Sequence, residues 1–195
     1  MKITLQRVKN LSFLVVDDFF TSKELQAVER EVKDLKRFLL SGLNTGVSTA
    51  ENNIPQKTGR GVFLDPLYLE NREASAILEG NRKLFSAEFI QTAENFDASF
   101  GAIRESNHDS TLLNYYVSGQ EYKAHRDGSR VSAVTFLREG NFTGGGFRFP
   151  SQGVDIEAVH NRTVVFPGCV LHQALPVHGD GARISIAQFI NFIEE

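Results

Sequence analysis

The sequence is poor in the features that build disulfide-bonded and membrane-spanning proteins. Cys169 is its only cysteine, so no disulfide can form within the chain, as is usual for proteins of reducing compartments. No apolar run approaches the roughly 20 residues that a membrane-spanning helix needs. The apolar stretch at residues 11–16 is too short for the hydrophobic segment of a signal peptide. We therefore expect a cytoplasmic location and no association with a membrane.

The chain also lacks tryptophan and lacks a strong charge of either sign. With no Trp and 16 Phe, phenylalanine must supply much of the aromatic volume of the core. The formal net charge of −3 and the sequence pI of about 6.0 provide no general attraction to nucleic acid or anionic lipid. No nucleic-acid partner is expected, and 195 residues suit a single domain with one core.

The N-terminal half contains helical patterns. A buried strand is expected at residues 13–16, and after it Thr21 and Glu24 match the pattern of a capping box. The apolar residues that follow recur at helical spacing and predict one buried helix face: Leu25, Val28, Val32, Leu35 and Leu39. Residues 73–97 are expected to form helix in two pieces around Gly80.

A long polar segment separates these helices. Residues 41–61 are rich in Gly, Ser, Thr and Asn and predict a loop, followed by a strand at 61–65. Long loops in compact domains often cover binding sites. We therefore expect residues 41–61 to act as a lid that closes over the site when substrate binds.

From residue 111 the apolar residues alternate with a period of two, which predicts strands. Turns rich in Gly or polar residues separate them. Eight strands are expected, at residues 111–117, 120–125, 131–138, 146–150, 154–158, 162–166, 170–174 and 182–192. This order predicts an α+β fold that is mainly β, with a double-stranded β-helix (jelly-roll) core. In a single domain 1–195, residues 1–110 would supply helical support and the lid, and residues 111–195 the jelly roll.

Three residues in this half carry the strongest chemical signal. His125 and Asp127 are two positions apart, so on a strand their side chains point to the same side, and His172 follows on a later strand. Two imidazoles and one carboxylate can occupy one face of a ferrous ion and leave the other positions for a chelating co-substrate and O2. The alternative is that His125 and Asp127 form exposed ion pairs with a neighbouring lysine or arginine; such pairs are common and contribute little to stability. His178 is the rival of His172, and Cys169 is expected to be an inert buried thiol.

Arg183 indicates which kind of co-substrate could bind beside such a metal centre. Its neighbours Ile184 and Ile186 occupy the other strand face, so Arg183 faces either solvent or the inside of the barrel. A buried arginine needs an anionic partner, and its planar fork suits a carboxylate. Ser185, two residues on, can add a second donor. The set fits a dicarboxylate co-substrate such as 2-oxoglutarate.

Longer motifs around these residues resemble the prolyl 4-hydroxylase branch of the 2-oxoglutarate/Fe(II) oxygenases. The best match is Tyr116-Val-Ser-Gly119-Gln120-Glu-Tyr122-Lys-Ala-His125-Arg-Asp127. The segments His172-Gln-Ala-Leu-Pro176-Val177 and, less specifically, Arg60-Gly-Val-Phe63 are similar as well. Two positions depart from the family pattern: Gly146 replaces an acidic residue, and Arg183 stands where collagen-type members usually carry lysine.

The resemblance implies a full set of site residues. His125, Asp127 and His172 would bind Fe(II), and Arg183 with Ser185 would bind 2-oxoglutarate. Tyr116, Tyr122 and Thr135 are further candidates for positions near 2-oxoglutarate. A wall of phenylalanines would shield the reaction: Phe136, Phe147, Phe149, Phe166 and Phe189. O2 would be consumed, with L-ascorbate as a candidate reductant.

The implied function is hydroxylation of a prolyl residue in a peptide or protein. The alternatives are hydroxylation of a free amino acid or another small molecule, and a non-catalytic jelly roll that binds a metal or a sugar. A nucleic-acid demethylase is disfavoured, because members of that branch usually carry a second arginine where this chain has Phe189. The oligomeric state is left open.

Overall fold

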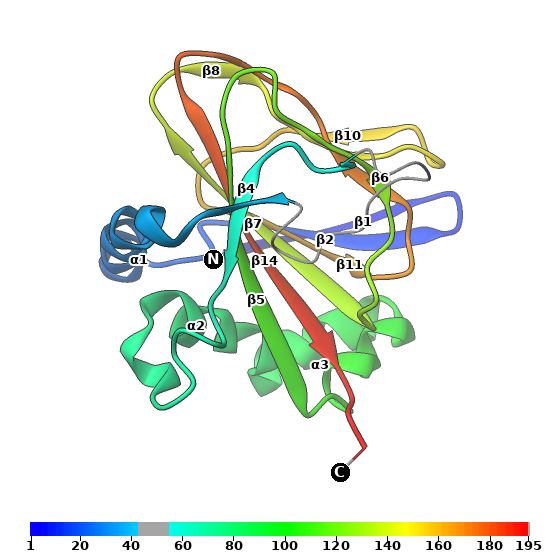
Figure 1. Cartoon of the computed structure of the whole chain (residues 1–195). Coiled ribbons are helices and arrows are strands. Elements are labelled where there is room, and N and C mark those ends of the chain that lie inside the picture. The colour runs from blue at the N-terminus through cyan, green and yellow to red at the C-terminus, as the bar shows by residue number, and fades with distance from the viewer. Residues whose placement is uncertain (43–54, 195) are drawn as a thin grey trace.

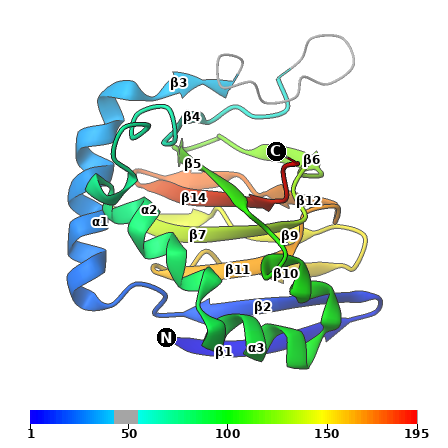
Figure 2. The ribbon, with the colours of Figure 1, turned by 90° about the horizontal axis from the view of Figure 1, so that it is seen from below.

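The computed structural model describes residues 1–42 and 55–194, and its architecture is a jelly roll (Figures 1 and 2). The large sheet has eight strands in the order β1 (Lys2–Val8), β2 (Leu11–Asp17), β11 (Arg162–Pro167), β7 (Val131–Glu139), β14 (Ala182–Asn191), β5 (His108–Tyr116), β4 (Arg60–Phe63) and β3 (Leu40–Ser41). The small sheet has four strands in the order β10 (Val154–Ile156), β9 (Phe147–Phe149), β12 (His172–Ala174) and β6 (Tyr122–His125). Paired strands within both sheets are antiparallel. The predicted mainly-β jelly-roll fold is therefore confirmed.

The helices cover one face of the large sheet, and the small sheet covers the other (Figure 1). The α-helices are α1 (Ser22–Leu35), α2 (Ala76–Asn81) and α3 (Ala87–Phe96), and 3-10 turns lie at Lys36–Phe38, Arg72–Ala74, Arg82–Phe85 and Ala98–Ile103. Ile184 and Ile186 of β14 pack toward the helices, whereas Ala187 packs toward the small sheet. The alternation of β14 thus separates a helical core from the interior of the jelly roll.

The start of α1 follows the predicted capping box. Thr21 accepts a hydrogen bond from the amide of Glu24, and Glu24 accepts one from the amide of Thr21. The predicted stripe is correct through Leu35, but the α-helix ends there. Leu39 is buried beyond a 3-10 turn, because its backbone is already extended. The expected break at Gly80 is wrong: Gly80 lies inside α2, and the chain breaks at residues 82–86, where Ser86 caps α3.

Four strands, β1, β3, β8 and β13, lie where the sequence predicted none. β8 (Phe142–Gly144) pairs with β13 (Val177–Gly179), and both lie in segments between the expected strands, where the sequence predicts turns. β1 forms a hairpin with β2 through a turn at Lys9, whose φ is +55°. β1 was missed because it is polar and forms the outer edge of the sheet. The lid prediction for residues 41–61 falls mainly on residues 43–54, which lie outside the described residues. In the described part of the chain, no helix combines the length and the apolar character needed to cross a membrane.

Candidate active site

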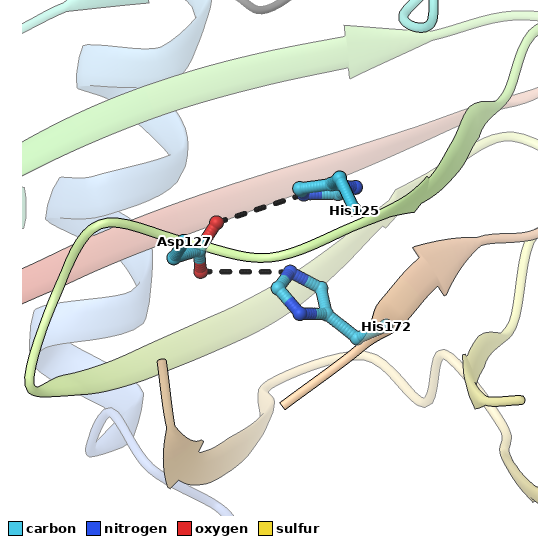
Figure 3. A group of neighbouring side chains, drawn as sticks. All are labelled: His125, Asp127 and His172. Carbon is cyan, nitrogen blue, oxygen red and sulfur yellow. Dashed lines mark ion pairs between the residues drawn. The ribbon is translucent and has the colours of Figure 1, made fainter. Parts of the chain in front are cut away.

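Three side chains converge between the small sheet and β7 (Figure 3). His125 ends β6 and His172 begins β12, and the two residues are direct partners in the register of these strands. Asp127 follows the end of β6. Its Oδ1 lies 3.6 Å from His125 Nε2, and its Oδ2 lies 3.5 Å from His172 Nε2. The ligand atoms of the three residues all lie within 4.8 Å of one another.

Both imidazoles are fixed in the form that binds a metal. The Nδ1 of His125 lies 2.7 Å from the carbonyl oxygen of Lys123, and the Nδ1 of His172 lies 2.8 Å from that of Val170. A carbonyl only accepts hydrogen bonds, so each Nδ1 donates and each Nε2 keeps its lone pair. Burial lowers the pKa of both His125 and His172 to about 4. At neutral pH both rings are therefore uncharged, and the Nε2 lone pair of each is available to a metal ion beside Asp127.

Asp127 is held by a chain of hydroxyl groups. Ser132 donates to its Oδ2 at 2.6 Å, and the hydroxyl of Ser129 lies 2.7 Å from that of Ser132. Burial raises the pKa of Asp127, and the bond from Ser132 opposes that rise. The distances from Asp127 to the two imidazoles are too long for hydrogen bonds. The three groups thus present free donor atoms to a common point, which fits a divalent ion of the iron type bound by two imidazoles and one carboxylate.

A cavity of about 400 Å³ extends from these residues along β14. At the end of the cavity that holds the three converging side chains, Ser132 pairs with Phe189 of β14. Arg183 lines the cavity near the other end of the same strand. Arg183, Ser185, Ala187 and Phe189 are alternate residues, and all four line the cavity. One strand therefore connects the two ends of the site.

Arg183 is a buried cation with unused donors. Its exposed fraction is 1%, and its Nη1 donates to the carbonyl oxygen of Gly145 at 2.9 Å. Its Nε and Nη2 have no hydrogen-bond partner in the described part of the chain. Its guanidinium lies 4.1 Å from the centre of the Tyr116 ring, and burial lowers the pKa of Arg183. Unpaired donors on a buried guanidinium are costly, so a bound carboxylate fits this position.

The other predicted co-substrate residues fall into two groups. Ser185, Tyr116 and Tyr122 line the cavity, and the Tyr122 ring stacks on His125 with centres 3.5 Å apart. Thr135 does not reach the cavity. It pairs with Ile186 on the helix-facing side of the sheet, and its hydroxyl bonds that of Thr163 at 2.6 Å. The prediction for Thr135 is therefore wrong, because the alternation of β7 turns its side chain away from the cavity.

The rival residues lie outside the three-residue group. His178 is exposed on β13, so the structure brings His172, not His178, to His125 and Asp127. Cys169 is exposed, which corrects the expectation of a buried thiol. Its carbonyl oxygen accepts a hydrogen bond from Arg126, so the backbone of Cys169, not its thiol, makes this contact.

The predicted phenylalanine wall surrounds the site in two layers. Phe136, Phe147 and Phe189 line the cavity. Phe149 and Phe166 pack behind them, and the Phe166 ring contacts the His172 ring with centres 4.8 Å apart. The imidazole of His172 is thus held between a backbone carbonyl on one side and aromatic rings on the other.

The sequence did not single out three polar residues around the cavity. Ser132 orients Asp127, and Asn114 lines the cavity on β5. Lys57 is buried, with an exposed fraction of 2%, and donates to Asn114 Oδ1. A polar residue in the apolar run Leu112-Leu113-Asn114 was a usable signal. Lys57 gave none, because its segment reads as a polar loop.

One family model matches the sequence. It is that of the 2OG-Fe(II) oxygenase superfamily, and it matches residues 111–191. This range holds His125, Asp127, His172 and Arg183. No curated protein sequence matches the chain.

Solved structures with the same fold include three prolyl hydroxylases. A Pseudomonas putida prolyl-4-hydroxylase aligns with a TM-score of 0.64 and 22% identity, over 95% of each chain. A Trichoplax adhaerens prolyl hydroxylase, solved with a hypoxia-inducible-factor peptide fragment, aligns with a TM-score of 0.62 and 15% identity over 92% of this chain and 83% of its own. The viral collagen prolyl hydroxylase of Paramecium bursaria Chlorella virus-1, solved with 2OG, aligns with a TM-score of 0.60 and 15% identity over 93% of this chain and 96% of its own.

Proposed function

We propose that the chain hydroxylates a prolyl residue in a peptide or protein, as a member of the 2OG-Fe(II) oxygenase superfamily, whose family model matches residues 111–191. One observation carries the assignment of the site. A cavity joins a group of two imidazoles and one carboxylate to a buried guanidinium that has two unpaired donors. These are the groups needed to hold the two ends of a 2-oxo dicarboxylate.

His125, Asp127 and His172 would hold the iron, and Arg183 the far carboxylate of 2-oxoglutarate. When bound, Fe(II) with 2-oxoglutarate and O2 supplies the oxidising chemistry that places a hydroxyl group on an unactivated C–H bond and releases succinate and CO2. The chain supplies orientation. The carbonyl oxygens of Lys123 and Val170 direct the two Nε2 atoms, and Ser132 fixes the carboxylate.

The residues around the triad also exclude water. Phe147 and Phe166 pack on His172, and Tyr122 stacks on His125. Val134, Phe136 and other apolar side chains line much of the remaining cavity, together with polar residues such as Asn114 and Ser185. Such a lining keeps a reactive oxidant away from solvent and from oxidisable side chains. The exposed Cys169 lies outside this lining.

Two features support a prolyl substrate. The fold is shared, over nearly the whole of both chains, with a bacterial prolyl-4-hydroxylase. One structural neighbour was solved with a peptide fragment. The same scaffold could serve a free amino acid, and this is the second candidate. A non-catalytic jelly roll is disfavoured, because simple metal binding gives no role to Arg183 at the far end of the cavity.

The test is succinate formation by the Fe(II)-loaded protein in air, with proline-containing peptides and, separately, free amino acids as substrates. We expect peptide-stimulated succinate formation and a product that has gained one oxygen atom on proline. Stimulation by free amino acids alone would favour the second candidate. No succinate with either class, from protein that binds Fe(II) and 2-oxoglutarate, would contradict the proposed substrate.

A further inference from the structure

Lys57 is a second buried cation beside Arg183. It lies just before β4, where its backbone bridges to Tyr122, and only 2% of it is exposed. Lysine is almost never fully buried unless it is paired. Among the described residues its ammonium group has one hydrogen-bond partner, the neutral amide oxygen of Asn114, and no carboxylate lies within ion-pair distance. Burial, and then the charge of Arg183, lowers the pKa of Lys57 to about 7.

The local sequence makes room for this side chain. A Cβ atom added at Gly61 would lie 2.8 Å from the Nζ of Lys57 and 3.1 Å from the Oδ1 of Asn114. A Cβ added two residues earlier, at Gly59, would run into the ring of Tyr116. Gly59 lies in the bend just before β4, and Gly61 lies within β4. Gly61 thus leaves room for the ammonium group of Lys57, and Gly59 leaves room for the Tyr116 ring that lies against Arg183.

Strand register places this ammonium group next to the carboxylate site. Asn114 pairs with Ser185, and Tyr116 pairs with Arg183, and these four residues line the cavity. The amide nitrogen of Asn114 contacts the carbonyl oxygens of Leu112 and Ser185 at 3.4 and 3.5 Å, so its oxygen is left to hold Lys57. Lys57 thus lies behind Asn114, which lines the cavity beside Arg183, and no carboxylate pairs with either cation among the described residues.

We propose that Lys57 is a second binding residue for the far carboxylate of 2-oxoglutarate, acting together with Arg183. The inference rests on the proposed function and extends it to a residue outside the matched range 111–191. Lys57 supplies charge and one donor, and Arg183 supplies the planar fork. The alternative role of Lys57 is structural, as a support for the amide of Asn114.

Two substitutions separate the roles. Lys57→Met removes both the charge and the hydrogen bond, whereas Lys57→Gln removes the charge and keeps a donor for Asn114. We expect both variants to bind 2-oxoglutarate about ten- to a hundredfold more weakly in anaerobic calorimetric titrations of the Fe(II)-loaded protein. Lys33→Met, at an exposed position on α1, is the matched control and should bind as the wild type does. Circular dichroism and thermal unfolding establish that each variant is folded.

Ligands that lack one end of 2-oxoglutarate show which of its two carboxylates Lys57 contacts. 2-Oxobutyrate has the same chelating end but lacks the far carboxylate, so its affinity should be equal in the wild type and in both Lys57 variants. The affinity of metal-free protein for glutarate, which keeps only carboxylate ends, should fall in the Lys57 variants. Both cations would contact the same carboxylate. The loss of 2-oxoglutarate binding free energy in the double variant Arg183→Met/Lys57→Met should therefore be smaller than the sum of the losses in the two single variants.

Three results would overturn the inference: wild-type affinity in Lys57→Gln, equal losses for 2-oxoglutarate and 2-oxobutyrate, or strict additivity with Arg183→Met. Each of these leaves the proposed function intact, provided that the wild type binds 2-oxoglutarate. A wild-type protein that binds Fe(II) but neither 2-oxoglutarate nor glutarate would instead refute the proposed function.

Discussion

Replacing Arg183 with methionine will weaken 2-oxoglutarate binding strongly without destabilising the ligand-free protein. The Nε and Nη2 groups of Arg183 have no partner in the described chain, so their charge-assisted hydrogen bonds are available to the ligand. Such contacts contribute about 1.5–3 kcal/mol, which corresponds to a loss of about ten- to a hundredfold in affinity.

The stability of the ligand-free protein should change little in the same variant. Arg183→Met removes one hydrogen bond, to Gly145, which contributes about 1 kcal/mol. It also removes a buried charge that has no counter-ion among the described residues, and apolar replacement of buried ionic groups is often neutral or stabilising. These two effects oppose each other, so we expect a free energy of unfolding within about 1 kcal/mol of the wild type.

Thermal unfolding with and without ligand measures both effects. At a concentration one hundred times the dissociation constant, a ligand stabilises the folded protein by about 2.7 kcal/mol. A thirtyfold loss of affinity in Arg183→Met would reduce this to about 0.9 kcal/mol at the same concentration. Arg183→Lys keeps the positive charge but loses the planar guanidinium, so 2-oxoglutarate should stabilise it less than the wild type and more than Arg183→Met. An Arg183→Met protein that is several kcal/mol less stable, yet stabilised by 2-oxoglutarate as the wild type is, would show that this arginine is structural.

Two further substitutions test the metal site and the fold. His172→Ala should abolish stoichiometric binding of Fe(II), measured by calorimetry, whereas His178→Ala should bind the metal normally because His178 is exposed on β13; the reverse pattern would refute the ligand assignment. Thr21→Ala removes the side-chain half of the capping box of α1 and should lower the free energy of unfolding in urea by about 1 kcal/mol, and an unchanged free energy would show that the cap contributes nothing to stability.

The sequence predicted the parts of the fold in which local and tertiary preferences agree. The capping box at Thr21 and the alternation along β14 each specify one structure, and the structure contains both. It did not predict β8 or β13, because strands rich in glycine have no apolar alternation to read. The helix break was misplaced for a related reason. Ser86, which caps α3, ends the preceding segment more effectively than Gly80 does.

The site was predicted to the extent that its residues share one strand or one motif. His125 and Asp127 are close in sequence, and Arg183 and Ser185 follow the period of β14. The prediction for Thr135 was wrong because its neighbour Phe136 faces the cavity, and successive residues of a strand point to opposite faces. Lys57 was missed because the segment before β4 joins the site only through tertiary pairing with Tyr122 and Asn114.

The central claim is that this cavity binds one metal ion and, next to it, one 2-oxoglutarate. The most direct measurement is an anaerobic calorimetric titration of metal-free protein with Fe(II), and then with 2-oxoglutarate, for the wild type and for Asp127→Ala. We predict one Fe(II) per wild-type chain, followed by one 2-oxoglutarate whose affinity is much lower when the metal is omitted, and no stoichiometric Fe(II) binding by folded Asp127→Ala. Full Fe(II) binding by Asp127→Ala, or a metal-loaded wild type that does not bind 2-oxoglutarate, would contradict the claim.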